Sequence, residues 1–201
     1  MKGLEVISPG LMTTIQDLGR TGWTQMGVPV SGAADQFSAA LANVLLGKEI
    51  NSPVLECTLS GPKLKLLIDQ QIVVTGARMQ VKINNKVVPH NTVINADAGS
   101  AIRIQSSNCG CRCYVAFSND MEATNFLGSV STYVPGKLGG INGRALKQGD
   151  TINFNSIDTN LIKSSQGTSQ QYNNSWLIRV TEGPEFKRLS SHAKDNIENI
   201  E

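Results

Sequence analysis

The 201-residue sequence has few aromatic side chains, no long apolar run and no excess of either charge. Aromatic residues make up 5% of the chain, and acids and bases are interspersed with a net charge of +2. A basic stripe of the kind that binds nucleic acid is therefore missing. No apolar stretch reaches the ~20 residues that a membrane-spanning helix needs, and the first residues lack the apolar region of a secretory signal. We expect a soluble, cytoplasmic protein that binds neither nucleic acid nor membranes.

Histidine and cysteine are also scarce, with two and four residues: His90, His192, Cys57, Cys109, Cys111 and Cys113. The C-x-C-x-C spacing is not a usual zinc pattern, so no metal site is expected. We expect the cysteines to be buried as small hydrophobic residues, and a metal or redox site on one strand face is the alternative. No histidine lies in a polar motif, which argues against a Ser-His-Asp arrangement. His90 follows a proline and is interpreted as a surface residue.

Short β-branched or alternating runs dominate what is present. They predict strands at 4–7, 63–68, 72–75, 79–83, 86–88, 92–94, 101–105, 113–117, 151–154 and 176–180. The runs 79–83 and 86–88 flank Asn84-Asn85, which indicates a hairpin. Many short strands at close spacing favour a barrel or a sandwich, so the fold class is mainly β.

Two helices interrupt this pattern. The first is predicted between Asp35 and Gly47, with a buried stripe at helical spacing formed by Phe37, Ala40, Leu41, Val44 and Leu45. The second is predicted from Glu185 to residue 200, with Pro184 in its first turn. Residues 156–175 are rich in Ser, Asn, Gln and Thr, which is typical of a linker or long loop. We therefore expect a β domain at 1–155, a linker at 156–175, and a further strand and helix at 176–201.

The densest polar motif is Gln16-Asp17-x-Gly19-Arg20, which lies ahead of the first helix. Arg20 carries a planar fork that can bind a carboxylate or phosphate with two hydrogen bonds. Asp17 could orient Arg20 or take part in proton transfer. The alternative is that the two residues pair with each other or cap a turn.

Other polar residues form three further candidate sites. Ser31, Gly32 and Asp35 precede the first helix, where backbone N–H groups can hold an anion; an ordinary helix cap is the alternative. The flexible run Gly139-Gly140-x-x-Gly143-Arg144 could approach a ligand, or form a tight connection between strands. Just upstream, the hydroxyls of Ser129 and Ser131 are candidate hydrogen-bond donors.

Glu56 lies in an otherwise apolar segment. A carboxylate in such a segment needs a partner if it is buried. We expect that partner to be Arg20 or Arg144.

In this order, the motifs resemble the biotin-dependent carboxyltransferase, or allophanate hydrolase subunit 2, family. The resemblance covers about residues 4–154 and rests on Pro9-Gly10-Leu11, Gln16-Asp17-x-Gly19-Arg20, Gly27-Val28-Pro29-x-Ser31-Gly32, Leu55-Glu56-x-Thr58, Leu127-Gly128-Ser129-x-Ser131-Thr132-Tyr133 and Gly139-Gly140-x-x-Gly143-Arg144. It implies a cyclophilin-like β-barrel. It also implies that a second, similar half of the family protein begins near Val180 and is then missing.

The resemblance implies three functions. The first is a component similar to the C subunit of an ATP-dependent 5-oxoprolinase complex, which hydrolyses 5-oxoproline to glutamate with a lactam-utilisation-type A subunit and a B subunit. The second is a carboxyltransferase acting on urea or a related amide; without an Ala-Met-Lys-Met motif in this chain, biotin would arrive on another protein. The third is a regulatory module that binds a kinase-inhibitor-like partner similar to the B subunit.

The resemblance also implies site residues. Asp17, Arg20 and Arg144 would be catalytic. The substrate would be bound by Gln16, Ser31, Gly32, Asp35, Glu56, Ser129, Ser131, Gly139 and Gly140. One departure from the family pattern is Asn119-Asp120, which replaces a glycine pair at the end of a strand and predicts a changed geometry there.

Overall fold

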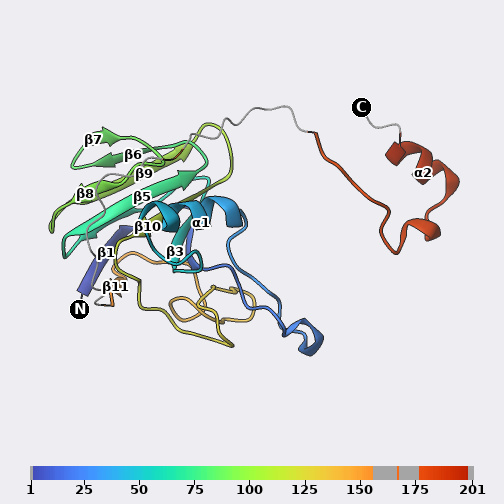
Figure 1. Cartoon of the computed structure of the whole chain (residues 1–201), viewed down its shortest axis with the longest axis horizontal. Helices are drawn as coiled ribbons and strands as arrows, with labels where there is room; N and C mark the ends of the chain where they lie inside the picture. Colours follow the sequence, from blue (N-terminus) through green and yellow to red (C-terminus); the bar gives the residue numbers. More distant parts are fainter. Residues whose placement is uncertain (1, 156–166, 168–176, 199–201) are drawn as a thin grey trace.

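A computed structural model describes residues 2–155, 167 and 177–198, and most of these residues form two antiparallel sheets (Figure 1). The first sheet has the order β11-β1-β4-β9-β6-β7. Its strands are β1 (Lys2–Ser8), β4 (Lys63–Leu66), β6 (Met79–Ile83), β7 (Lys86–Val88), β9 (Ala101–Ser107) and β11 (Thr151–Asn153). The second sheet has the order β2-β3-β10-β5-β8. Its strands are β2 (Met12–Gln16), β3 (Val54–Thr58), β5 (Gln70–Gly76), β8 (Ile94–Ala96) and β10 (Arg112–Phe117).

The prediction of a mainly β fold is confirmed, but the strands form two separate sheets rather than one closed barrel.

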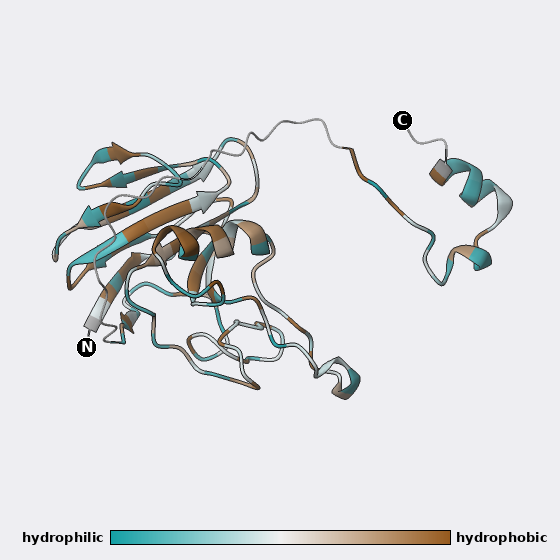
Figure 2. Cartoon of the chain, in the orientation of Figure 1, coloured by the Kyte–Doolittle hydropathy of each residue, from teal (hydrophilic) through white to brown (hydrophobic). Residues whose placement is uncertain are grey.

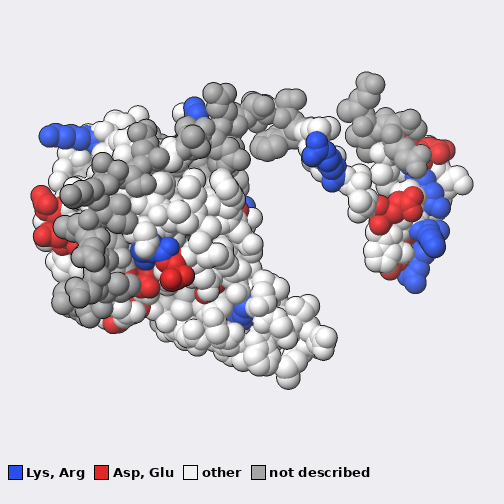
Figure 3. Space-filling model, viewed as in Figure 1, with Lys and Arg blue, Asp and Glu red and all other residues white. Residues whose placement is uncertain are grey.

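No helix in the described ranges is long and apolar enough to cross a membrane. Figure 3 shows Lys and Arg interspersed with Asp and Glu on the face in view, in agreement with the balanced composition.

The main core fills the space between the two sheets. Strand β4 shows the sequence rule behind it: Lys63 and Lys65 are exposed, whereas the alternating Leu64 and Leu66 are fully buried. Figure 2 shows the same alternation of hydrophilic and hydrophobic residues along other strands. Each fully buried Leu contributes about 1.5–3 kcal/mol through removal of apolar surface from water. The rings of Phe117 and Phe154 meet in this core with their centroids 5.2 Å apart.

Helix α1 (Gln36–Leu45) covers the outer face of the second sheet. Its predicted start and end are confirmed, but of its predicted buried stripe only Leu45 is buried. Phe37 and Val44 are 67% and 53% exposed, and the buried residues are Ser38, Ala39, Ala42, Asn43 and Leu45. The small Ala39 and Ala42 side chains allow close packing on the sheet, whereas the sequence pattern gives most weight to larger side chains.

Buried polar contacts fix this orientation of α1. Thr75 Oγ1 donates a hydrogen bond to Ser38 O at 2.6 Å, and Asn43 Nδ2 donates one to Ser52 O at 2.8 Å. The apolar face that includes Phe37 and Val44 is left on the side away from the sheet.

The other strand predictions have mixed outcomes. The hairpin of β6 and β7 is confirmed, with Ile83 opposite Lys86 and positive φ angles at Asn84 and Asn85. Strands β2 and β3 were not predicted, because Thr, Gln and Glu interrupt their apolar pattern. The strand predicted at 176–180 is wrong for residues 177–180, which form no strand; residue 176 lies outside the described residues.

The second predicted helix is also only partly correct. A 3-10 turn η2 (Phe186–Arg188) comes first and α2 (Ser191–Glu198) follows, so a single helix from Glu185 is wrong. The predicted linker at 156–175 lies outside the described residues, except for Gly167. Gly167 N donates a hydrogen bond to Asn91 O at 2.8 Å.

Two irregular segments lie beside β2. The first, residues 118–150, is called the bridging loop here; Thr132 N in this loop donates to Ile15 O at 3.0 Å and Leu146 N donates to Thr13 O at 2.8 Å. The second, residues 19–32, is called the arm and carries the 3-10 turn η1 (Thr24–Met26). Figure 1 shows η1 at the end of the arm, away from the sheets.

Candidate functional site

Asp17 is the centre of a buried hydrogen-bond network at the end of β2. Its carboxylate is 4% exposed as a residue and accepts hydrogen bonds from Ser129 Oγ at 2.6 Å, Val130 N at 2.7 Å and Gly19 N at 2.8 Å. It also accepts one from Ser131 Oγ. Since a buried carboxylate is stable only when it is paired or hydrogen-bonded, these four donors explain why Asp17 can lie inside the protein. They join β2 to the bridging loop.

Arg20 lies in the same network and is 1% exposed. Its guanidinium donates to Ser31 Oγ at 3.0 Å, to Phe126 O at 3.3 Å and to Ser131 O. The guanidinium carbon also lies 5.8 Å from the centre of the Phe126 ring, a cation–π contact. Within the described ranges no carboxylate lies within 4 Å of it, so Asp17 and Arg20 do not form the direct pair considered as an alternative. Ser131 links them instead.

The glycine turn of the bridging loop packs directly on this network. A Cβ atom at Gly139 would lie 2.1 Å from Ser131 O, and one at Gly140 would lie 2.0 Å from Thr132 Oγ1. The structure therefore brings Asp17, Arg20, Ser31, Ser129, Ser131, Gly139 and Gly140 together, although they come from two distant parts of the sequence. We call these residues the polar cluster. Their catalytic and binding roles stay predictions, because the hydrogen bonds show only that they hold the arm and the bridging loop together.

Arg144 lies further along the bridging loop and pairs with Asp150. Its two terminal nitrogens are 2.7 and 2.9 Å from the two carboxylate oxygens of Asp150, a bidentate geometry. The Arg144 side chain is 29% exposed, so it is open to solvent in a way that Asp17 and Arg20 are not.

This ion pair gives a testable pH dependence. The hydrogen bond from Arg144 is the main cause that lowers the pKa of Asp150, and the N–H of Lys147 adds to it. A lowered folded-state pKa means that the pair stabilises the protein above the ordinary aspartate pKa of about 3.9, and that this contribution is lost as the pH falls below it. Arg144→Gln is expected to raise the pKa of Asp150, measured by NMR titration of its carboxyl carbon; an unchanged pKa would contradict the pairing.

Glu56 has a different partner from the one expected. Its Oε2 accepts hydrogen bonds from Tyr114 OH and Ala34 N, both at 2.8 Å, and its Oε1 lies 3.4 Å from Arg112 Nε. The expectation of Arg20 or Arg144 is therefore wrong. Strand pairing explains the partner, because Tyr114 of β10 lies opposite Glu56 of β3. Burial, followed by the negative charge of Glu56, raises the pKa of Tyr114, which keeps this phenol protonated.

The residues ahead of α1 are engaged in the local fold. Asp35 caps the helix, since its carboxylate accepts hydrogen bonds from Ser38 N at 3.0 Å and from Ser38 Oγ at 2.6 Å. Ser31 has a φ of 56° and Gly32 has a φ of 90°, so both lie in the left-handed region at the turn that leads to the helix. This is the capping role that was considered as the alternative for Asp35; an anion site at this turn stays a prediction.

Gln16 retains an open hydrogen-bonding capacity. Its Nε2 donates to Thr14 Oγ1 at 3.0 Å and to Thr132 O at 3.2 Å, whereas its buried Oε1 has no hydrogen-bond partner among the described residues.

At the end of β10, the Asn119-Asp120 pair carries side-chain contacts that glycines would lack: Asp120 Oδ1 lies 2.6 Å from Lys48 Nζ. Asn119 and Asp120 both have negative φ angles, so no glycine is required there.

The cysteines divide between core and surface. Cys57 and Cys113 are buried and lie opposite each other on β3 and β10, as expected for small hydrophobic residues. Cys109 is half-buried and Cys111 is exposed. The expectation of buried cysteines is therefore wrong for these two. Both precede β10, so the alternative of a site formed by thiols on one strand face is not supported either.

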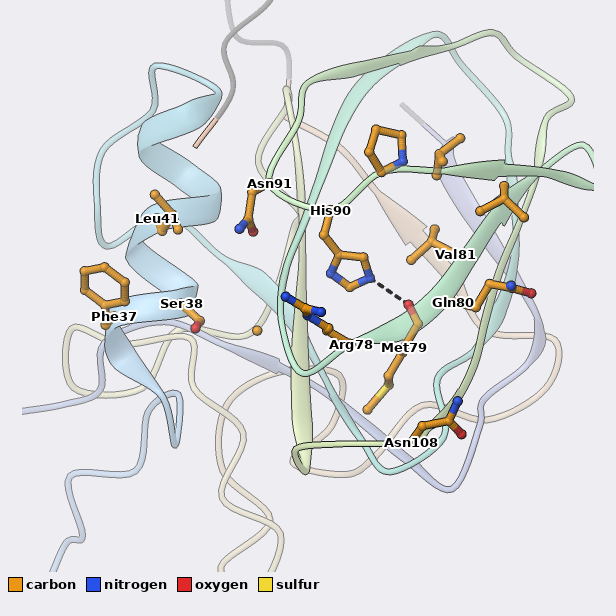
Figure 4. A pocket seen from close by; sticks show the side chains of 14 residues that line it. Phe37, Ser38, Leu41, Arg78, Met79, Gln80, Val81, His90, Asn91 and Asn108 are labelled. Atoms are coloured by element: carbon orange, nitrogen blue, oxygen red, sulfur yellow. Dashed lines mark hydrogen bonds between the residues drawn. The ribbon is translucent and has the colours of Figure 1, made fainter. Parts of the chain in front are cut away.

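A pocket of about 500 Å³ has none of the predicted site residues in its lining, although one lining residue, Ser38, is hydrogen-bonded to Asp35. It opens between α1 and the β6–β7 hairpin, and the structure places His90 in it (Figure 4). The surface interpretation of His90 is wrong, because its Nε2 lies 2.7 Å from Met79 O and its Nδ1 is buried. Sequence reasoning missed this pocket, since its two walls are far apart along the chain and neither carries a recognisable motif.

With this geometry described, comparisons with known proteins decide the family. Residues 26–200 match the family described as carboxyltransferase domain, subdomain A and B. The chain belongs to this carboxyltransferase-domain family. The resemblance inferred from the ordered motifs is thereby confirmed. Within the polar cluster, Asp17 and Arg20 precede the matched residues, and the other members lie inside them.

Curated relatives of this carboxyltransferase-type domain include urea amidolyases and the C subunits of 5-oxoprolinases. It is 39% identical over 152 residues to the urea amidolyase of Lachancea kluyveri, covering 75% of this chain and 8% of that protein. It is 33% identical over 185 residues to the urea amidolyase of Saccharomyces cerevisiae, covering 92% of this chain and 10% of that protein. It is 30% identical over 194 residues to the C subunit of the 5-oxoprolinase of Escherichia coli, covering 96% of this chain and 61% of that protein. The chain thus spans between 8% and 61% of the length of these relatives.

Two solved structures share the fold. The crystal structure of the urea amidolyase of K. lactis matches with a TM-score of 0.76 and 36% identity, over 84% of this chain and 10% of that one. The crystal structure of the protein TTHA0988 matches with a TM-score of 0.85 and 28% identity, over 92% of this chain and 36% of that one. The fold of this chain is therefore that of a known carboxyltransferase-type domain.

Proposed function

We propose that this chain acts as the counterpart of the C subunit in a 5-oxoprolinase, which opens the ring of 5-oxoproline to glutamate together with the A and B subunits. The observation that carries the proposal is the alignment with the C subunit of the E. coli 5-oxoprolinase over 96% of this chain and 61% of that protein. The two urea amidolyases are more similar in sequence over the aligned residues, and this chain corresponds to 8% and 10% of their length.

Ring opening of 5-oxoproline requires an energy source and groups that stabilise negative charge in the transition state. An amide in a five-membered ring is stable in water, so ATP, bound by the complex, would activate the amide oxygen as a phosphorylated species. Cationic groups would stabilise the charge that develops on it. Of the two arginines predicted to be catalytic, Arg144 is the better placed. Its terminal nitrogens bind Asp150, but its side chain is 29% exposed, whereas Arg20 is enclosed by the polar cluster. Arg20 and Asp17 would then position the bridging loop.

Reconstitution tests the proposal. The full chain is combined with the A and B subunits of the E. coli enzyme, and the release of glutamate and ADP from 5-oxoproline and ATP is measured. We expect turnover only when all three proteins are present. The variant Arg144→Gln should lower turnover by about 10²-fold if it stabilises charge in the transition state, whereas the exposed, matched Arg103→Gln should leave it unchanged.

Two outcomes would replace the proposal with another function. A stable complex with the B subunit that gives no 5-oxoproline turnover would indicate a regulatory module of the kinase-inhibitor-binding kind. Absence of any complex, together with transfer of a labelled carboxyl group from a carboxylated biotin carrier protein to urea, would indicate a urea-type carboxyltransferase. The 39% and 33% identities to urea amidolyases make this the second candidate function.

A further inference from the structure

Three cationic side chains lie in one row on the outer face of the first sheet. In the strand register, Lys63 of β4 and Lys82 of β6 are both opposite Arg103 of β9. Lys63 and Arg103 are exposed and Lys82 is half-buried, whereas their neighbours along each strand are buried. Directly opposite residues of antiparallel strands have Cβ atoms about 4.5–5.5 Å apart, so the row contains two close like-charge pairs, an arrangement that lowers stability.

The row is not neutralised by the described part of the chain. None of its three cations forms an ion pair or a side-chain hydrogen bond there. The row continues at its two ends with Ser8 of β1 and Val87 of β7, which are uncharged. In the neighbouring row, Glu5 lies opposite Lys65 rather than opposite any of the three. The positive charge is thus open to a ligand.

A hollow of about 670 Å³ lies over this row, near the start of β4. Lys63 and Arg103 line it, and no Asp, Glu or aromatic residue is among its described lining residues. The lining also has neutral polar side chains that form no hydrogen bond with other described residues: Ser8, Ser60, Gln80, Gln105, Ser106 and Asn108. The hollow therefore combines positive charge with free hydrogen-bond donors and acceptors.

These features indicate the chemistry of a ligand. A phosphate ester carries about −1.5 to −2 charges at neutral pH and three acceptor oxygens, so it neutralises the row with fewer groups than carboxylates would. The row crosses three neighbouring strands and extends over about 10 Å, which suits two phosphate groups better than one. Hydroxyl groups complement the neutral side chains. A nucleobase would find no aromatic ring to stack on among the described lining residues.

We propose that this hollow binds a polyol that carries two phosphate groups, such as a sugar bisphosphate. The phosphates would contact Lys63, Arg103 and Lys82, and the hydroxyl groups of the polyol would bind the Ser, Gln and Asn side chains. The site shares no residue with the polar cluster or with the Arg144–Asp150 pair, so it is independent of the function proposed above. Binding would place negative charge between the like charges and stabilise the folded chain.

The test uses D-fructose 1,6-bisphosphate as the probe and isothermal titration calorimetry of the full chain as the measurement. We expect saturable binding with a Kd of about 1 mM or tighter at low ionic strength. D-Fructose 6-phosphate lacks one phosphate and inorganic pyrophosphate lacks the polyol, so each should bind at least about tenfold more weakly. ATP should also bind more weakly. Raising the salt from about 0.01 M to about 0.1 M shortens the Debye length from about 30 Å to about 10 Å, and should weaken binding of the bisphosphate.

Four variants locate the binding. Arg103→Gln and Lys63→Gln should each weaken it at least about tenfold, whereas Lys187→Gln, an exposed lysine outside the hollow, should have no effect. Arg144→Gln should also retain binding. Because Arg103→Gln removes both like-charge pairs, its unfolding temperature without ligand should be no lower than that of the unchanged chain. This measurement separates a lost contact from a lost fold.

The proposal is overturned if the bisphosphate shows no saturable binding up to about 10 mM, or if Arg103→Gln binds it as tightly as the unchanged chain. Equal affinity for pyrophosphate or ATP would overturn the choice of a polyol. Binding of poly-L-glutamate without binding of the bisphosphate would replace the proposal with a docking surface for an acidic protein. These outcomes are distinguishable from failure of the 5-oxoproline assay, since Arg103→Gln should lose binding and keep turnover, and Arg144→Gln should do the reverse.

Discussion

Replacement of Arg20 by alanine is expected to lower the free energy of unfolding by about 3–5 kcal/mol. The guanidinium is 1% exposed and donates hydrogen bonds to Ser31 Oγ, Phe126 O and Ser131 O. Alanine leaves the buried Ser131 O and the partly buried Ser31 Oγ and Phe126 O without their donor and creates a cavity where the side chain was. Denaturation by urea, followed by circular dichroism, measures the loss.

Two further variants show whether the guanidinium itself is required. Arg20→Lys keeps the charge but not the planar fork, so it should recover only part of the stability. Arg103→Ala removes an exposed arginine and should cost less than about 0.5 kcal/mol. A loss below about 1 kcal/mol for Arg20→Ala would show that the buried network does not hold the bridging loop. If the large loss is found, reduced turnover of an Arg20 variant has to be corrected for its unfolded fraction before it is interpreted as catalysis.

Gly139→Ala is expected to destabilise the protein by about 3 kcal/mol or more. Gly139 has a φ of +65°, which disfavours any residue with a Cβ atom. The added Cβ would also lie 2.1 Å from Ser131 O and 2.8 Å from Ser131 C. These are backbone atoms, so relief requires movement of the bridging loop rather than rotation of a side chain. Because Ser131 O accepts from Arg20, the movement would disturb the polar cluster as well.

Gly149→Ala is the matched control for this effect. Gly149 has a similarly positive φ of +85°, but a Cβ atom there would meet nothing within 4 Å. Its alanine variant carries only the backbone cost, about 1–2 kcal/mol. Thermal unfolding of the two variants separates the steric contact from the conformational preference. Equal losses would mean that the contact of Gly139 with Ser131 contributes nothing.

Local sequence signals predicted the elements whose structure depends on near neighbours. Asn84-Asn85 adopts the positive φ angles of a tight hairpin turn, which asparagine tolerates. The carboxylate of Asp35 caps α1, and alternation in β4 places Leu64 and Leu66 in the core. Strand β2 was not predicted, because polar residues interrupt its apolar pattern. The buried face of α1 was predicted incorrectly, because the sequence pattern gives most weight to large side chains.

The sequence predicted which residues belong to the candidate site, but not how they are buried or which of them bind one another. The motifs identified Asp17, Arg20 and Ser131 as belonging together, because they recur in one family pattern. Nothing in their spacing indicated that all three would be buried, or that Ser131 would bind both others. The partner of Glu56 depended on the pairing of β3 with β10, a choice among strands that no local pattern encodes.

By itself, the sequence determined the mainly β class, the ends of the first helix, the hairpin and the family, since each depends on residue types at short or ordered spacing. Only the tertiary structure decided that Arg20 is enclosed while Arg144 stays partly accessible, and that Leu41 and Val81 line the same pocket. The physical reason is that the burial of a side chain and the choice of its partner depend on which distant segments pack together. The free energy of that packing comes from the whole core rather than from any one segment.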